Sequence, residues 1–148
     1  MGTQEVSPRI VFDTNTVVSA LLFPTGSLAW LRQSWHSRTV IPLVNKATMQ
    51  ELYRILCHPK FSLAAAEREE LLCDYLPFAE LVTMPVRLPA LPQCRDSHDQ
   101  KFIELAFYAK ADMLVTGNKD LLVLANKVKF LICNPVICRD RLMSTSKA

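Results

Sequence analysis

The sequence has 148 residues, half of them apolar and 21% charged, which is the composition of an ordinary globular domain and excludes a disordered chain. Seventeen basic and fourteen acidic residues give a net charge of +3, a mild excess that is compatible with nucleic-acid binding but does not establish it. Because no apolar stretch approaches the ~20 residues of a membrane helix and no signal-peptide pattern is present, we expect a cytoplasmic protein without membrane contact.

The first half of the chain alternates strand and helix patterns. A β-branched and aromatic run predicts a strand at residues 9–12, and helical spacing of apolar residues predicts a short helix at 14–22. A second helix is expected at about 27–36 and a second strand at 39–44. The apolar spacing at 46–56 predicts an amphipathic helix.

The second half continues this alternation. We expect a helix at 64–75, a strand at 80–84 and the clearest helix of the chain at 97–110. The last expected elements are a strand at 112–115, a short helix at 119–125 and a strand at 128–133. Short apolar strands that alternate with helices predict an α/β fold, with a parallel sheet covered by helices on both faces.

Four acidic residues occupy positions that such a sheet would bring together. Asp13 directly follows the first strand, and Asp120 follows the turn after the fourth. Asp99 lies in the first turn of the clearest helix, and Glu51 lies on the helix after the second strand. Because the carboxyl ends of parallel strands share one edge, we expect these four side chains to form one site.

Crowded carboxylates repel one another unless they hold a proton or a cation. Oxygen ligands without a cysteine partner favour Mg²⁺ or Mn²⁺. Such ions suit phosphodiester hydrolysis, in which one ion activates a water and a second stabilises the departing oxygen. Each acid taken singly also fits an ordinary role as a helix cap, a turn residue or a solvated side chain, so the inference rests on the joint pattern.

Neighbouring residues fit supporting roles. Asn15 and Thr116 would hold the turns and orient the carboxylates, although simple turn formation explains them equally well. The flanking cations Arg95, Lys101 and Lys119 could contact phosphates, and a solvated charged surface is the alternative interpretation.

Four ordered segments of the chain resemble those of the PIN-domain nucleases, especially the branch of toxins from bacterial toxin–antitoxin modules. The segments are residues 11–21, with Val11-Phe12-Asp13-Thr14-Asn15, 51–61, 95–106 and 111–122, with Thr116-Gly117 before Asp120-Leu121-Leu122. The resemblance implies a three-layer α/β/α sandwich with a central, mostly parallel sheet of four or five strands. It predicts one PIN-like domain at 9–142, with flexible ends at 1–8 and 143–148.

The resemblance also implies a Mg²⁺- or Mn²⁺-dependent endoribonuclease that is restrained by a small antitoxin protein and is often a homodimer. Asp13, Glu51 and Asp99 fall on the acidic positions of the family, and Asp96 lies in the same block. Many relatives read Thr-Gly-Asp in the last block, whereas Asn118 stands here in place of that acid. The fourth acid is therefore expected to be Asp120.

Three functional hypotheses follow. In the first, Asp13, Asp99 and Asp120 hold metal, Glu51 binds it or orients the attacking water, and RNA is hydrolysed. In the second, the missing charge at Asn118 leaves a domain that binds RNA or a protein without cleaving. In the third, a phosphatase uses Asp13 as its nucleophile, but the second acid that such enzymes carry two residues later is replaced by Asn15.

Overall fold

The computed structural model describes residues 6–146. Residues 1–5 of the expected N-terminal lead and 147–148 of the expected C-terminal tail therefore lie outside the described part. The chain forms a five-stranded sheet in which every pair of neighbouring strands is parallel, in the order β3-β2-β1-β4-β5. The strands are β1 (Arg9–Phe12), β2 (Ile41–Val44), β3 (Glu80–Leu81), β4 (Met113–Val115) and β5 (Leu131–Cys133).

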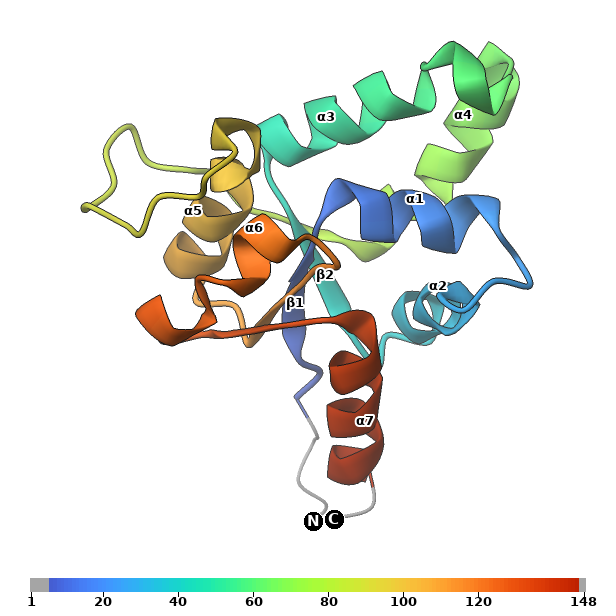
Figure 1. Ribbon diagram of the computed structural model, residues 1–148. Helices are drawn as coiled ribbons and strands as arrows, with labels where there is room; N and C mark the ends of the chain where they lie inside the picture. The colour runs from blue at the N-terminus through green and yellow to red at the C-terminus, as the bar shows by residue number, and fades with distance from the viewer. Residues whose placement is uncertain (1–5, 147–148) are drawn as a thin grey trace.

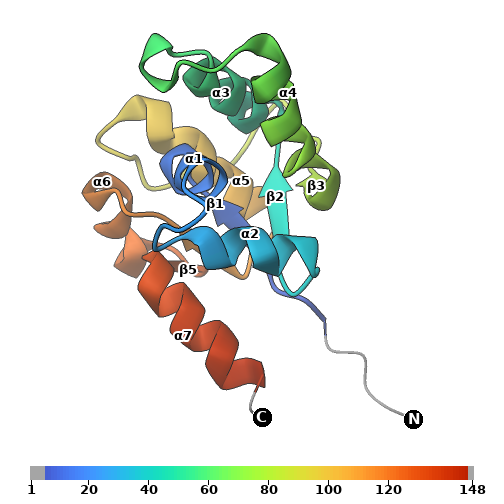
Figure 2. The same ribbon diagram turned by 90° about the vertical axis from the view of Figure 1, so that its right-hand side faces the viewer.

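Helices cover both faces of this sheet, which makes the fold a three-layer α/β/α sandwich (Figure 1). The helices are α1 (Thr14–Leu22), α2 (Ala29–His36), α3 (Lys46–Leu56), α4 (Ala65–Cys73), α5 (Gln100–Tyr108), α6 (Lys119–Leu122) and α7 (Pro135–Ser146). Figure 2 shows α1, α2 and α7 in front of the sheet and α5 behind α1. Helix α6 packs with α5 in the core of the opposite face. No helix of the described residues is both long and apolar enough to cross a membrane.

Alternation along the central strand divides the core into two layers. Ile10 and Phe12 point into the core beneath α1 and α2, where Trp35 is fully buried. Val11 points to the opposite face and packs with Phe102 of α5. Because successive side chains of a strand leave on opposite faces, a run of three apolar residues can support both helical layers.

The observed elements differ from the expected ones mainly at their ends. Strand β3 has two residues and β5 has three, fewer than the expected spans. Helix α7 was not predicted, because its sequence lacks a clear helical apolar period, although its Cys138 is fully buried. This helix continues to Ser146, beyond residue 142, at which the domain was expected to end.

Candidate active site

The strand order creates one reversal point in the sheet. From β1 the chain continues outward to β2 and β3 on one side, and later to β4 and β5 on the other. Ligands of open α/β sheets bind outside the carboxyl ends of the strands at such a point. Asp13 directly follows β1, and Thr116 directly follows β4. The expected site therefore lies between these two strand ends.

Asp13 is held rigidly at the start of α1. Its Oδ1 accepts a hydrogen bond from the backbone N–H of Thr16 at 2.9 Å, so it is the N-cap of the helix. Its Oδ2 accepts a hydrogen bond from the hydroxyl of Thr116. The side chain is buried, with 6% of the residue's surface exposed. Two hydrogen bonds from different segments thus fix the orientation of this carboxylate.

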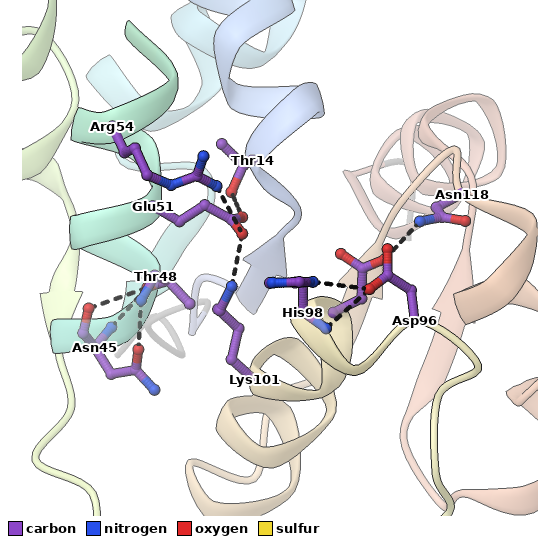
Figure 3. A network of polar contacts seen from close by, with 10 residues as sticks. Thr14, Asn45, Thr48, Glu51, Arg54, Asp96, His98, Lys101 and Asn118 are labelled. Carbon is purple, nitrogen blue, oxygen red and sulfur yellow. Dashed lines mark hydrogen bonds and ion pairs between the residues drawn. The ribbon is translucent and has the colours of Figure 1, made fainter. Parts of the chain in front are cut away.

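Glu51 projects from α3 toward the start of α1. Its Oε2 accepts a hydrogen bond from the Thr14 hydroxyl, and its Oε1 lies 2.6 Å from Nζ of Lys101 on α5. Figure 3 shows Lys101 reaching up to this carboxylate, with Arg54 on the other side of it. The guanidinium of Arg54 is 4.0 Å away. Both oxygens of Glu51 are therefore engaged by groups of the protein.

Asp99 ends a 3₁₀ turn at Ser97–Asp99 and occupies the N-cap position of α5, where its side chain makes no capping hydrogen bond. Its Oδ2 accepts a hydrogen bond from Nδ2 of Asn118 at 2.8 Å. Partial burial raises the pKa of Asp99, and the negative charges of Asp96, Glu51 and Asp13 raise it further, whereas Lys101 acts in the opposite direction. Like charges of separate segments thus act on one another here.

These residues share a cavity of about 360 Å³. Its acidic lining residues are Asp13, Glu51, Asp96 and Asp99. An adjoining cavity of about 380 Å³ extends past the other side of Asp13 toward α7 and shares Asn15 and Asn118. The structure therefore brings Asp13, Glu51 and Asp99 together, as the sequence predicted, although their assignment to catalysis remains a prediction.

Comparison with known proteins identifies the family. Residues 9–120 match the PIN domain, which is about three quarters of the chain. The chain belongs to the PIN domain family. An uncharacterized protein of Methanocaldococcus jannaschii, MJ1680, is 25% identical over 133 residues, which cover 90% of this chain and 85% of the relative. The crystal structure of PAE2754 from Pyrobaculum aerophilum shares the fold with a TM-score of 0.57 at 16% identity, over 93% of this chain and 90% of that one.

PIN domains are generally nucleases, and the nucleases of this family typically use divalent metal ions. The donor chemistry of this PIN domain fits such an ion, because the carboxylates of Asp13, Glu51, Asp96 and Asp99 line one cavity and no sulfur ligand lies among them. In the part of the chain that the structure describes, however, no three His, Cys, Asp or Glu side chains are arranged to hold a metal as they stand. Each carboxylate instead accepts a hydrogen bond from a neighbouring residue.

The fourth expected acid lies elsewhere in this PIN domain. Asp120 lines neither cavity beside Asp13, and Asn118 occupies the position on the lining. The reason is local. Asn118 is the N-cap of α6 and its Oδ1 accepts from the backbone N–H of Asp120, so its Nδ2 faces Asp99. Asp120 leaves the helix two residues later, in another direction.

Other expected site residues occupy varied positions. Asn15 is exposed on the cavity lining, and Asp96 caps the 3₁₀ turn by accepting from the backbone N–H of His98 at 2.9 Å. Arg95 and Lys119 are exposed and do not line the cavity beside Asp13.

The cavity is also lined by Arg54, which was not expected from the sequence. The available signal was its spacing of three residues from Glu51 on one helix.

Proposed function

We propose that this protein is a Mg²⁺- or Mn²⁺-dependent endoribonuclease that hydrolyses RNA phosphodiester bonds. The observation that carries the proposal is the convergence of Asp13, Glu51 and Asp99 on one cavity at the reversal point of the sheet. Membership of a nuclease family supports hydrolysis of a nucleic acid. The choice of RNA rests on the resemblance of the four sequence segments to the toxin branch.

Each residue of the candidate active site has a separate proposed role. Asp13 and Asp99 would hold the ion, which when bound supplies an activated water and neutralises charge on the phosphate. Glu51 would bind the ion as well or accept a proton from the attacking water. Thr116 and the N–H of Thr16 keep the Asp13 carboxylate oriented. Asp120 remains a candidate fourth ligand whose side chain would have to turn toward the cavity.

We further propose that the protein is the toxin of a toxin–antitoxin module. The support is the sequence similarity of four segments to the toxin branch of the PIN-domain nucleases. These segments are residues 11–21, 51–61, 95–106 and 111–122. A small antitoxin protein and a second copy of the chain are the partners that this assignment implies. Co-expression with any small protein encoded beside this chain's gene, followed by purification through a tag on one chain, tests the antitoxin partner.

The central test is incubation of the purified protein with end-labelled RNA, with Mg²⁺ or Mn²⁺ and with EDTA. We expect cleavage only with metal, and we expect Asp13→Asn to reduce it by at least about 100-fold while the fold persists, because one buried negative charge is lost without a change in shape. Asp140→Asn on the exposed surface of α7 is the matched control and should cut normally. Cleavage by Asp13→Asn at the normal rate would refute the proposal.

One observation favours a second candidate function, an RNA- or protein-binding PIN domain without cleavage. Asn118 is neutral and donates a hydrogen bond to Asp99, so a position that is acidic in many relatives adds no charge to the cavity. Calorimetric titration with Mn²⁺ separates the candidates. A nuclease should bind the ion in a manner that depends on Asp13, whereas a binding module should show RNA affinity that is indifferent to metal.

A further inference from the structure

Lys101 brings a positive charge into the acidic cluster. Its Nζ lies 2.6 Å from Oε1 of Glu51, and the two side chains are only 20% and 11% exposed. The same charge opposes the rise in the pKa of Asp99, which is caused mainly by burial. The pKa of Asp96 is lowered mainly by the hydrogen bond from the His98 backbone N–H, and the charge of Lys101 adds to this effect. The ammonium group thus pairs directly with Glu51, and its charge acts only at longer range on Asp96 and Asp99. From the sequence, Lys101 was either a phosphate contact or part of a solvated charged surface.

We propose that Lys101 is a positioning residue that acts as a substitute cation: its ammonium holds the Glu51 carboxylate in the metal-free protein and releases it when a divalent ion enters. This inference rests on the proposed metal-dependent function. It accounts for two observations together. Four carboxylates line the cavity beside Asp13, yet no three potential ligands among the described residues are placed to hold a metal ion. The chain itself supplies the compensating charge that crowded acids require.

A second cavity beside Lys101 offers its ammonium group an alternative position. The residue also lines a separate cavity of about 420 Å³ beneath the proline-rich connector at 84–93. Glu104, one turn further along α5, lines that same cavity. Because lysine carries a compact charge on a flexible stem, its ammonium could move from Glu51 to the side of Glu104 without a change in the backbone.

Arg54 provides the contrast. Its guanidinium is 4.0 Å from the same Glu51 oxygen, but its side chain is 68% exposed. Ion pairs in such solvated positions contribute little, whereas an ion pair shielded from water leaves an uncompensated charge when one partner is removed. Lys101, and not Arg54, is therefore the cation with which a metal ion would compete for Glu51.

The test is calorimetric titration of Mn²⁺ into the full-length protein and its Lys101→Met variant, in which a chain of similar length carries no charge. We expect the variant to bind Mn²⁺ about tenfold more tightly, the scale on which groups just outside the ligands affect metal affinity. Arg54→Met should change the affinity much less, and Lys101→Arg should stay close to the unmodified protein. The gain should vanish when Glu51→Gln is added, because the released ligand is then missing.

Thermal unfolding gives a second measurement that does not require catalysis. In EDTA the Lys101→Met variant should unfold at a lower temperature than the unmodified protein, since Glu51 has lost its partner. Addition of Mn²⁺ should restore the lost stability, so that the two proteins become similar. A loss of stability that Mn²⁺ does not restore would mean that Lys101 is only a structural ion-pair partner, and would overturn the inference.

The outcomes separate this inference from the proposed function. If the unmodified protein binds Mn²⁺ but Lys101→Met binds it no more tightly, the substitute-cation role is wrong while the metal-dependent function stands. A gain in affinity that persists with Glu51→Gln also overturns the inference, because it would reflect general electrostatics. If neither protein binds Mn²⁺, both proposals fail. If only Lys101→Met binds it, Lys101 blocks the site without releasing Glu51 to an ion, and both the inference and the metal-dependent function of the unmodified protein are overturned.

Discussion

Thr116 donates its hydroxyl hydrogen to Oδ2 of Asp13, although the two residues are 103 positions apart in the sequence. The Thr116 oxygen also accepts a hydrogen bond from the backbone N–H of Asn118 at 2.9 Å. A single fully buried hydroxyl therefore joins the end of β1 to the turn after β4. This link holds the two sides of the candidate active site in register.

We expect Thr116→Val to weaken both the fold and the site. Valine has the same shape but no hydroxyl, so the buried Asp13 carboxylate loses a donor and the N–H of Asn118 loses its acceptor. Unsatisfied buried groups of this kind cost about 1–3 kcal/mol each. The Asn118 N–H is only part-buried and can bind water, so the loss at Asp13 should dominate, and urea denaturation should show a destabilisation of about 1–3 kcal/mol. Mn²⁺ affinity should fall because Asp13 is no longer oriented.

Thr116→Ser is the matched control, because it keeps the hydroxyl and removes only a methyl group. It should retain most of the Mn²⁺ affinity. If serine and valine were equally damaging, the methyl packing of Thr116 and not its hydrogen bonds would be responsible.

The sequence predicted much of the fold because local pattern and tertiary burial agree. The apolar run at β1 and the helical spacing in α1 and α3 were located at their observed bounds. Helix α7 was missed, since only a few of its side chains meet the core and its apolar residues follow no clear period. The strand order could not be read from the sequence, because pairing between distant strands leaves no local signal.

The same division applies to the site. Asp13 could be predicted because an acid directly after a parallel strand faces the ligand-binding edge whatever the strand order. The choice between Asn118 and Asp120 could not, since it depends on which residue caps α6. The partner of Lys101 was also hidden, because Glu51 lies on another helix, 50 residues away.

The raised pKa of Asp99 predicts a cost in stability for the metal-free protein. A carboxyl group whose pKa is higher in the folded state than in the unfolded state destabilises the fold above that pKa, and the penalty disappears as the pH falls below the unfolded value. Asp99→Asn should therefore stabilise the metal-free protein at neutral pH, by less than about 1 kcal/mol because solvent screens a partly exposed charge. The measurement is thermal unfolding in EDTA at neutral and acidic pH.

The same group predicts a pH dependence for metal binding. A cation needs the ionised form of Asp99, so Mn²⁺ affinity of the unmodified protein should decline as the pH falls through a value above the usual pKa of aspartic acid. Asp99→Asn should bind Mn²⁺ weakly at every pH and should lose its stability advantage once Mn²⁺ is added. An unchanged affinity in this variant would remove Asp99 from the ligand set.

Asn118→Asp should restore the negative charge that many relatives carry. Without metal, the new carboxylate would face Asp99 in place of the donated hydrogen bond, and the repulsion should destabilise the protein by about 1–2 kcal/mol. With Mn²⁺, affinity should rise roughly tenfold, equivalent to about 1.4 kcal/mol. Calorimetry and unfolding with and without Mn²⁺ measure both effects. A stable variant with unchanged affinity would show that Asn118 does not limit the site.

Asp120→Asn decides whether the fourth acid takes part. Its side chain lies outside the two cavities beside Asp13. Burial is the main cause of the raised pKa of the Cys94 thiol, and the charges of Asp99 and Asp120 raise it further. We therefore expect Asp120→Asn to change Mn²⁺ affinity by less than about threefold, whereas Asp99→Asn should reduce it by more than about tenfold. The comparison by calorimetry is internally controlled, since each variant removes one negative charge. Equal losses in the two variants would mean that Asp120 turns toward the ion on binding, and the ligand set predicted from the sequence would then be the correct one.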